Sequence, residues 1–239
     1  MTSAPAILAF DTATSTCSVA ITRGNRSSGR VVGSLSFASG ASHSRRLLGS
    51  LDWLLQTTEM SISDIAALAV GTGPGSFTGL RIGMATAKGL SHGKGLPLIG
   101  ISSLDAVAAS VRSQRLICVV MDARKKEVYC CFYRSKPDWT VVRCAKPAVM
   151  APEELVRLIN EPVTMAGDGV CVYNDLFSQL LGDTAELLPW ISTPSAVNIG
   201  FLASSTQDAG NYLDLDRATP EYVRSSDAQL SLVSPLKSG

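Results

Sequence analysis

The sequence predicts an α/β fold of two lobes, each built on a mixed β-sheet. Three observations lead to this prediction. Apolar segments with the length of strands alternate with segments of helical periodicity. The apolar runs 7–11 and 116–122 both end in an aspartate, and a second strand-like run follows each of them. A chain of 239 residues, 46% of them hydrophobic, is also long enough to bury a sizeable core.

The first lobe is expected to comprise residues 1–112. Three strand-like runs open it, with a turn signal at Gly24-Asn25. Five leucines between residues 47 and 55 then place one apolar stripe on a helix, which Ser42 or Ser44 could cap. In chain order the predicted elements are strands at 7–11, 17–22 and 31–37, a helix at 47–55, a strand at 65–70, a helix at 80–90, a strand at 97–101 and a helix at 104–111.

The second lobe is expected to comprise residues 113–224, with the boundary near Arg112 to Arg115. Residues 225–239 are rich in serine and poor in aromatic residues, which predicts a flexible tail. The predicted elements are strands at 116–122 and 127–133, a helix at 153–159, a strand that ends at Ala166, and helices at 176–181 and 195–209.

Composition excludes several classes of protein. The 21 basic and 20 acidic residues nearly cancel, so no overall positive field favours nucleic-acid binding by this chain alone. The six cysteines show no CxxC spacing and are interpreted as reduced core residues in a reducing compartment. Because no signal-peptide pattern and no apolar run of about 20 residues is present, we expect a soluble, cytoplasmic protein.

A glycine-rich segment at residues 71–79 joins a predicted strand to a predicted helix. It matches neither the Walker A spacing nor the dinucleotide fingerprint. One interpretation is a tight turn in which Gly73 and Gly75 supply unusual dihedral angles. The other is an anion site formed by Ser76, Thr78 and the backbone N–H groups of the turn.

The helices at 47–55 and 80–90 differ in their side chains. The first carries leucines with Trp53 off the stripe, and the second is rich in glycine and alanine. Either the two helices only cover their own sheet, or a partner's helices pack against them. Lys88 on the second helix is interpreted as a solvated or interface charge.

Two halves that each open with strand, aspartate, turn and strand resemble the superfamily of actin, sugar kinases and acetate kinase (ASKHA). In that superfamily two RNase-H-like lobes enclose ATP. Within it, the segments 71–90 and 97–104 are similar to the TsaB (YeaZ) family. Shorter similar segments are residues 7–12, His43-Ser44, 121–124, 127–129, 166–169 and 220–224.

The resemblance implies a non-catalytic subunit required for threonylcarbamoyladenosine modification of tRNA beside the anticodon. It implies TsaD, the threonylcarbamoyl transferase, and TsaE, an ATPase, as protein partners, and contact with tRNA only through the complex. It implies no membrane partner, and a homodimer is an alternative for the isolated chain. The partner interface is expected on the two helices, at His43, Leu47, Leu51, Trp53, Leu80, Arg81, Met84 and Ala87.

The resemblance also implies a nucleotide site that has lost its function. Ala13 stands where active members carry a glycine that lets the backbone approach phosphate. TsaD has a His-x-x-x-His metal motif where this chain has Ser103 and Val107, and neither can replace a histidine ligand. We therefore expect no catalytic residue, no metal and no cofactor, although ATP or ADP at the joint with TsaD stays open. The expected remnants of the phosphate loops are Asp11, Thr12, Gly73, Gly75, Ser76, Asp122, Gly167 and Asp168.

An alternative from a different class is a small ATP-dependent kinase or nucleotide hydrolase. It would use the three aspartates at strand ends, Asp11, Asp122 and Asp168, around Mg–ATP. ATP turnover that is lost in Asp11→Ala would favour this alternative.

Overall fold

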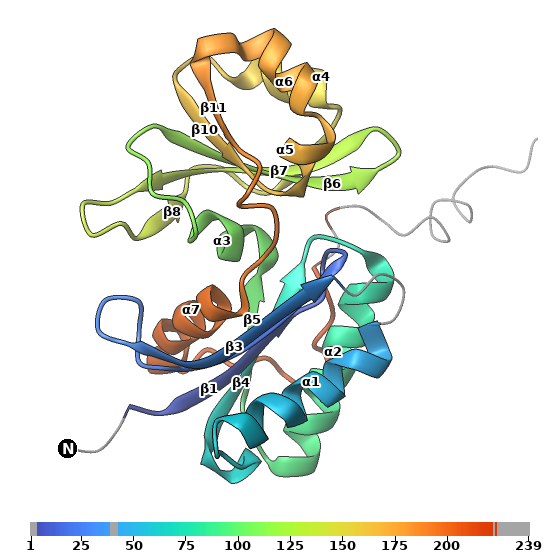
Figure 1. Cartoon of the computed structure of the whole chain (residues 1–239), viewed down its shortest axis with the longest axis vertical. Coiled ribbons are helices and arrows are strands. Elements are labelled where there is room, and N and C mark those ends of the chain that lie inside the picture. The colour runs from blue at the N-terminus through green and yellow to red at the C-terminus, as the bar shows by residue number, and fades with distance from the viewer. Residues whose placement is uncertain (1–3, 39–42, 222, 224–239) are drawn as a thin grey trace, which may run out of the picture.

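The computed structural model describes residues 4–38, 43–221 and 223, and leaves the side chains of residues 43–45 undescribed. The predicted tail at 225–239 and the side chain of His43 therefore lie outside the described part. The chain forms two lobes, each with its own sheet, with a short helix at the joint (Figure 1). The prediction of mixed sheets with helices is confirmed.

The sheet of the first lobe has five strands in the order β3-β2-β1-β4-β5. The first three strands are antiparallel neighbours, whereas β4 and β5 run parallel to β1. Because apolar residues fill both faces of β1 and β4, this sheet is buried between helices. The strands are β1 (Ala6–Asp11), β2 (Thr16–Arg23), β3 (Arg30–Ala38), β4 (Ile65–Gly73) and β5 (Leu98–Ser102).

The sheet of the second lobe follows the same path, β11-β10-β6-β7-β8, with β9 also paired to β7. Its central strand β6 has an antiparallel neighbour, β7, and a parallel neighbour, β10, as β1 has in the first sheet. The two halves thus share one topology. The strands are β6 (Leu116–Arg124), β7 (Glu127–Ser135), β8 (Val141–Arg143), β9 (Ala148–Met150), β10 (Val163–Ala166) and β11 (Ala185–Leu188).

Helices cover both sheets. In the first lobe α1 and α2 lie side by side on one face, and α7 lies on the other (Figure 1). Among the described residues, no helix combines the length and apolar character needed to cross a bilayer. The helices are α1 (His43–Thr57), α2 (Phe77–Lys94), α3 (Ser103–Ala108), α4 (Pro152–Leu158), α5 (Asp168–Val172), α6 (Asn174–Leu181) and α7 (Ala196–Asp208), with 3-10 turns at Ile62–Asp64 and Gly182–Thr184.

The last helix of each half packs against the sheet of the other half. Helix α3 follows β5 and contacts β6 and β7 as well as β4 and β5 of its own half, and α7 follows β11 but contacts β1, β2, β4 and β5. Small residues permit the close approach of α7, since a Cβ atom on Gly200 would lie 2.3 Å from the Thr22 hydroxyl oxygen. The sequence assigns α7 to the second lobe, whereas in space it belongs to the core of the first.

The joint between the lobes is filled with apolar side chains. Leu80 of α2 and Val107 of α3 belong to one buried cluster with Val119 of β6. On α3, the Asp105 carboxylate accepts hydrogen bonds from the Tyr133 hydroxyl at 2.8 Å and from the Arg143 guanidinium at 2.7 and 2.9 Å. These contacts fix α3 to the second sheet.

Candidate functional site

Three aspartates meet at the joint between the lobes. Asp11 ends β1, Asp122 lies near the end of β6, and Asp168 begins α5 directly after β10. The Oδ1 atom of Asp168 accepts a hydrogen bond from the Asp122 backbone N–H at 2.9 Å. The charge of Asp168 is the smallest contribution to the raised pKa of Asp11, so the two carboxyl groups lie within range of electrostatic interaction. The repeated topology brings these three predicted residues together.

The carboxyl group of Asp11 is fully enclosed, with 1% of the residue exposed. Its Oδ1 accepts the Ala13 N–H and its Oδ2 accepts the Ser103 hydroxyl, both at 2.7 Å. A Cβ atom on Gly71 would lie 1.8 Å from Oδ2, so only glycine leaves room for this carboxyl. Burial is the main cause that raises the pKa of Asp11 to about 6, and the two hydrogen bonds oppose it.

The glycine-rich segment packs directly against the turn that follows Asp11. The Thr12 hydroxyl donates to the Gly79 carbonyl at 2.8 Å, and the Ser76 N–H donates to the Ala13 carbonyl at 2.7 Å. A Cβ atom on Gly75 would lie 2.3 Å from that Ala13 oxygen. Polar groups of the aspartate turn that could face phosphate are thus engaged inside the protein.

The same geometry favours the structural interpretation of the glycine segment. Gly73 has φ +104°, a conformation that suits glycine. The Ser76 hydroxyl accepts a hydrogen bond from the Gly79 N–H at 3.3 Å and so caps the N-terminus of α2. This hydroxyl satisfies one of the backbone N–H groups that have no partner within the helix. Thr78 is exposed on the first turn of α2.

In the second lobe the corresponding turn is equally tight. Gly167 has φ +114°, and a Cβ atom there would lie 2.1 Å from the Val120 carbonyl oxygen. The carboxylate of Asp122 accepts the Arg124 N–H at 2.9 Å and pairs with its guanidinium at 3.2 Å. Burial raises the pKa of Asp168 to about 6.

The three aspartates of the joint all have partners within the chain. The Asp11 carboxylate accepts a hydrogen bond from the Ser103 hydroxyl, and the Asp122 carboxylate forms an ion pair with the Arg124 guanidinium. Val107 lies in the apolar core of the joint. Within the described ranges, no group of three or more His, Cys, Asp or Glu side chains could hold a metal ion.

Five of the expected partner contacts lie inside the protein, so the prediction is wrong for these residues. They are buried because the apolar stripes of α1 and α2 face their own sheet, where four join the core cluster of β1 and β4 and Leu80 joins that of the joint. Their exposed fractions are 4% or less; the residues are Leu47, Leu51, Leu80, Met84 and Ala87.

Other side chains form the outer face of α1 and α2, which we call the outer helix face. Trp53 and Arg81 are exposed as the sequence suggests, whereas Leu48 and Phe77, 52% and 43% exposed, were missed. The Arg81 guanidinium lies over the Phe77 ring, 5.1 Å from its centroid. The signal for Leu48 is its helical phase, about 100° from Leu47.

Small residues lie between these larger side chains on the outer helix face. Gly49, Ala85 and Gly89 are exposed, and a Cβ atom on either glycine would meet no other atom within 4 Å. Small exposed residues bordered by aromatic and aliphatic side chains allow another helix to approach closely. His43 begins α1.

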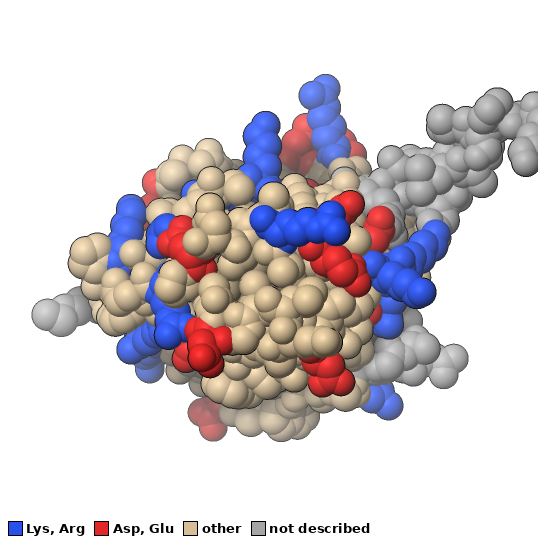
Figure 2. Space-filling model, turned by 90° about the horizontal axis from the view of Figure 1, so that it is seen from above, with Lys and Arg blue, Asp and Glu red and all other residues tan. Residues whose placement is uncertain are grey.

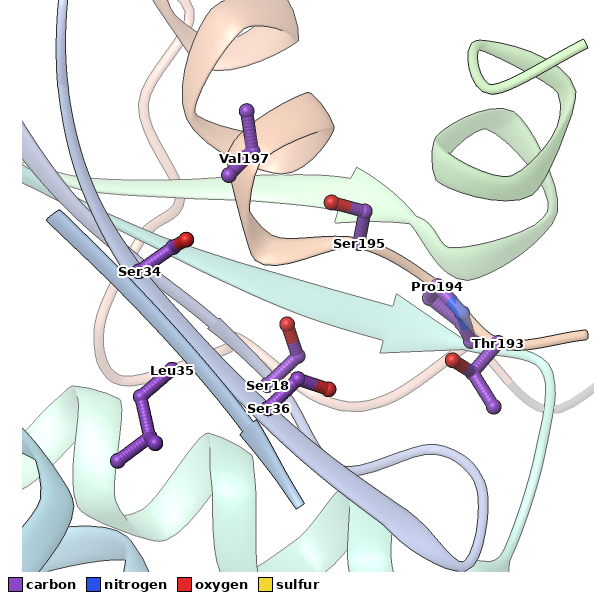
Figure 3. Close-up of a pocket in the computed structure, with 8 residues that line it drawn as sticks. All are labelled: Ser18, Ser34, Leu35, Ser36, Thr193, Pro194, Ser195 and Val197. Carbon is purple, nitrogen blue, oxygen red and sulfur yellow. The ribbon is translucent and has the colours of Figure 1, made fainter. Parts of the chain in front are cut away.

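A small pocket lies between the start of α7 and strands β2 and β3 (Figure 3). Its volume of about 120 Å³ is well below the roughly 300–1,000 Å³ of small-molecule sites. The Ser18 hydroxyl at its wall already accepts the Ala196 N–H at 3.0 Å. No charged residue lines it; the lining residues are Ser18, Ser34, Leu35, Ser36, Thr193, Pro194, Ser195 and Val197.

The outer end of the second lobe carries charges of both signs. Figure 2 shows Lys and Arg side chains interspersed with Asp and Glu side chains around an area of other residues. Mixed charges of this kind give the visible face no continuous positive surface for a nucleic-acid backbone.

Comparison with known proteins gives consistent matches over most of the chain. The family model described as TsaD, tRNA N6-adenosine threonylcarbamoyltransferase, matches residues 37–229. The Escherichia coli (strain K12) tRNA threonylcarbamoyladenosine biosynthesis protein TsaB is 34% identical over 232 residues, which cover 93% of this chain and 96% of that protein. The Bacillus subtilis (strain 168) protein of the same name is 27% identical, over 97% of this chain and 99% of that protein.

Two solved structures from Pseudomonas aeruginosa have the same fold. YeaZ superposes with a TM-score of 0.77 at 28% identity, over 91% of this chain and 99% of that one. A protein described as similar to peptidase YeaZ gives 0.77 at 27% identity, over 92% of this chain and 100% of that one. Together with the family model and the repeated topology, these matches confirm the predicted two-lobed α/β fold with mixed sheets.

Proposed function

The chain belongs to the TsaB (YeaZ) family of tRNA threonylcarbamoyladenosine biosynthesis proteins, and we propose that it is a non-catalytic subunit that binds and activates TsaD. The observation that carries this proposal is the outer helix face. It presents Leu48, Trp53 and Phe77 to solvent around small residues, although α1 and α2 already have a complete core beneath them. Exposed charged residues such as Asp52 and Arg81 lie on the same face, and aromatic and aliphatic side chains among small and charged ones suit a partner's helices.

The joint between the lobes supports a non-catalytic role. The Asp11 carboxylate and the Ala13 amide are bonded to groups of the protein itself. A peptidase role, which the description of one similar structure suggests for YeaZ, lacks support here. His43 begins α1 with its side chain outside the described part, and the described His92, in the last turn of α2, has no hydrogen-bonded carboxylate or nucleophile of the kind that a catalytic triad needs.

The contribution of such a subunit is conformational. By binding one conformation of TsaD more tightly than another, it shifts the population of TsaD by at most that difference in binding free energy. TsaE joins the same assembly in this proposal, and the tRNA contacts this chain only within the complex, in the cytoplasm. Any ATP or ADP would bind at the joint with TsaD.

A pull-down with co-expressed TsaD tests the proposal at the outer helix face. Leu48→Asp and Ala85→Asp place a charge at exposed positions, so the fold stays intact while binding weakens at least about tenfold. Aspartate at Leu80 or Ala87 is unsuitable because both are buried. Leu158→Asp is the matched control, since Leu158 is 56% exposed on α4 of the other lobe.

Three outcomes are informative. Binding that survives both substitutions in the outer helix face would contradict the proposed interface. Absence of binding by the unmodified chain would contradict the proposed function itself. Light scattering of the isolated chain, with and without TsaD, distinguishes a self-associating dimer from a subunit that associates only with TsaD.

A second candidate function is a small ATP-dependent kinase or nucleotide hydrolase. The observation in its favour is that Asp11, Asp122 and Asp168 all lie at the joint between the lobes. The purified chain should then turn over ATP with Mg²⁺, and Asp11→Ala should abolish that turnover. We expect no such activity, because Ala13 and its contact with Gly75 fill the position where phosphate would approach the backbone.

A further inference from the structure

After α7 the chain returns along the first lobe. Residues 211–221 run beside β5 and α2, and in Figure 1 the red end of the described chain comes to lie next to α2. This segment has no regular secondary structure, yet its backbone and side chains make specific contacts along its length.

The first contact is made at the free edge of the first sheet. The Leu213 N–H donates to the Leu98 carbonyl of β5 at 2.8 Å, and β5 is the last strand of the first sheet. The Leu213 side chain packs where Gly100 has none, because a Cβ atom there would lie 3.0 Å from Leu213 Cδ1. A turn follows, in which the Ala218 N–H donates to the Asp214 carbonyl at 2.7 Å.

The second contact is with α2 itself. The Lys88 ammonium donates to the Ala218 carbonyl at 3.3 Å, and Ala218 is buried in the core cluster that includes Met84 and Ala87 of α2. Lys88 is therefore partly buried and hydrogen-bonded within the chain, a contact that its interpretation as a solvated or interface charge does not include. Its hydrogen bond joins residues 130 positions apart in the chain.

The third contact lies at the start of α2. The Glu221 N–H donates to the Thr72 carbonyl at 2.7 Å. The Glu221 carbonyl oxygen lies 3.2 Å from the position of a Cβ atom on Gly73, in the turn that leads into α2. The segment is thus attached to the sheet edge, to the middle of α2 and to the turn before it.

These contacts place α2 between α1 on one side and residues 211–221 on the other. On the face of the first sheet, α1 lies over β2 and β3, α2 lies mainly over β4, and residues 211–221 cover the strip beside β5. We propose that residues 211–221 are a strap that fixes the position of α2, and that Lys88 is the positioning residue through which the strap sets the affinity of the outer helix face for its partner. This inference rests on the proposed function.

Hydrogen exchange and binding to TsaD test the strap together. Lys88→Met removes the donor but keeps an unbranched side chain, and Lys88→Arg keeps a cationic donor. We expect Lys88→Met to speed amide exchange in α2 and to weaken TsaD binding, each about five- to thirtyfold. Lys88→Arg should restore much of both, whereas Lys94→Met, at an exposed position at the end of α2, should change neither.

A second variant acts at the other end of the strap. Leu213→Ala removes the side chain that packs at Gly100 and should produce the same faster exchange in α2. Unchanged exchange in both Lys88→Met and Leu213→Ala would overturn the strap. Weaker binding by Lys88→Met without faster exchange would also overturn it, because Lys88 would then contact the partner directly.

The exchange measurement needs no partner. If the unmodified chain does not bind TsaD, the proposed function fails, while faster exchange in both variants would still support the strap as a support of α2. If the unmodified chain binds TsaD and all variants bind equally well, the proposed function stands and the inference about affinity fails.

Discussion

Replacing Asp11 by asparagine should stabilise the protein at neutral and alkaline pH. The carboxyl group is buried, and burial raises its pKa from 3.8 to about 6. Asparagine has nearly the same shape and keeps both hydrogen bonds. Its amide oxygen can accept the Ala13 N–H, and its amide nitrogen can donate to the Ser103 hydroxyl oxygen.

The magnitude follows from the change in pKa. A difference of one pKa unit corresponds to about 1.4 kcal/mol. The rise from 3.8 to about 6 therefore makes the ionised Asp11 cost the folded state about 3 kcal/mol. Below pH 3.8 the group is protonated in both states, and this cost is absent. The free energy of unfolding therefore falls as the pH rises from 3.8 to about 6. Above about pH 6 the folded protein has also released the proton, and the free energy of unfolding no longer changes with this group.

Urea denaturation of Asp11→Asn and of the unmodified protein at several values between pH 4 and pH 8 checks this prediction. The variant should gain up to about 3 kcal/mol at pH 8, and the gain should vanish near pH 4. Asp183→Asn, at an exposed position, is the control and should leave the free energy of unfolding unchanged at every pH. A variant that is less stable at pH 8 would refute the reasoning, because the charged form would then be favoured by its hydrogen bonds.

Three further predictions concern stability and thiol reactivity. Tyr133→Phe should lower the free energy of unfolding in urea by about 1–2 kcal/mol, because it removes the 2.8 Å hydrogen bond to Asp105; no loss would mean that the joint does not depend on it. Gly167→Ala should cost at least about 2 kcal/mol in the same assay, since φ is +114° and the new Cβ atom would lie 2.1 Å from a carbonyl oxygen of β6. In the native protein, a thiol reagent should modify Cys144 and Cys171 rapidly and the four buried cysteines only on unfolding; fast reaction of more than two thiols would contradict the described burial.

The sequence predicts the elements with strong local signals. The apolar runs ending at Asp11 and Asp122 become the central strands of the two sheets, and the glycine segment becomes a strand-to-helix turn. The strands β8, β9 and β11 were missed because they have only three or four residues and lack a clear alternation. The position of α7 on the first sheet was missed because local periodicity carries no information about which sheet a helix covers.

The candidate site divides in the same way. The aspartates and glycines predicted as phosphate-loop remnants lie at strand ends that the repeated topology places at the joint, and their role as remnants stays a prediction. Five of the predicted partner contacts proved to be buried, because an apolar stripe indicates which side of a helix is buried but not what buries it. The stripe of Leu47 and Leu51 serves the protein's own core, so the outer helix face is formed by residues off the stripe, such as Leu48.

The filled joint and the strap have a common physical consequence for a binding subunit. An actin-like enzyme needs lobes that move around its nucleotide, whereas here Asp105, Tyr133 and Arg143 tie α3 to the second lobe, and Ser103 ties it to Asp11 of the first. A partner that binds such a preformed face loses less conformational entropy than one that must order it. Under the proposed function, the contacts that fix the joint thereby favour docking, and loosening them should weaken binding even where no partner atom is touched.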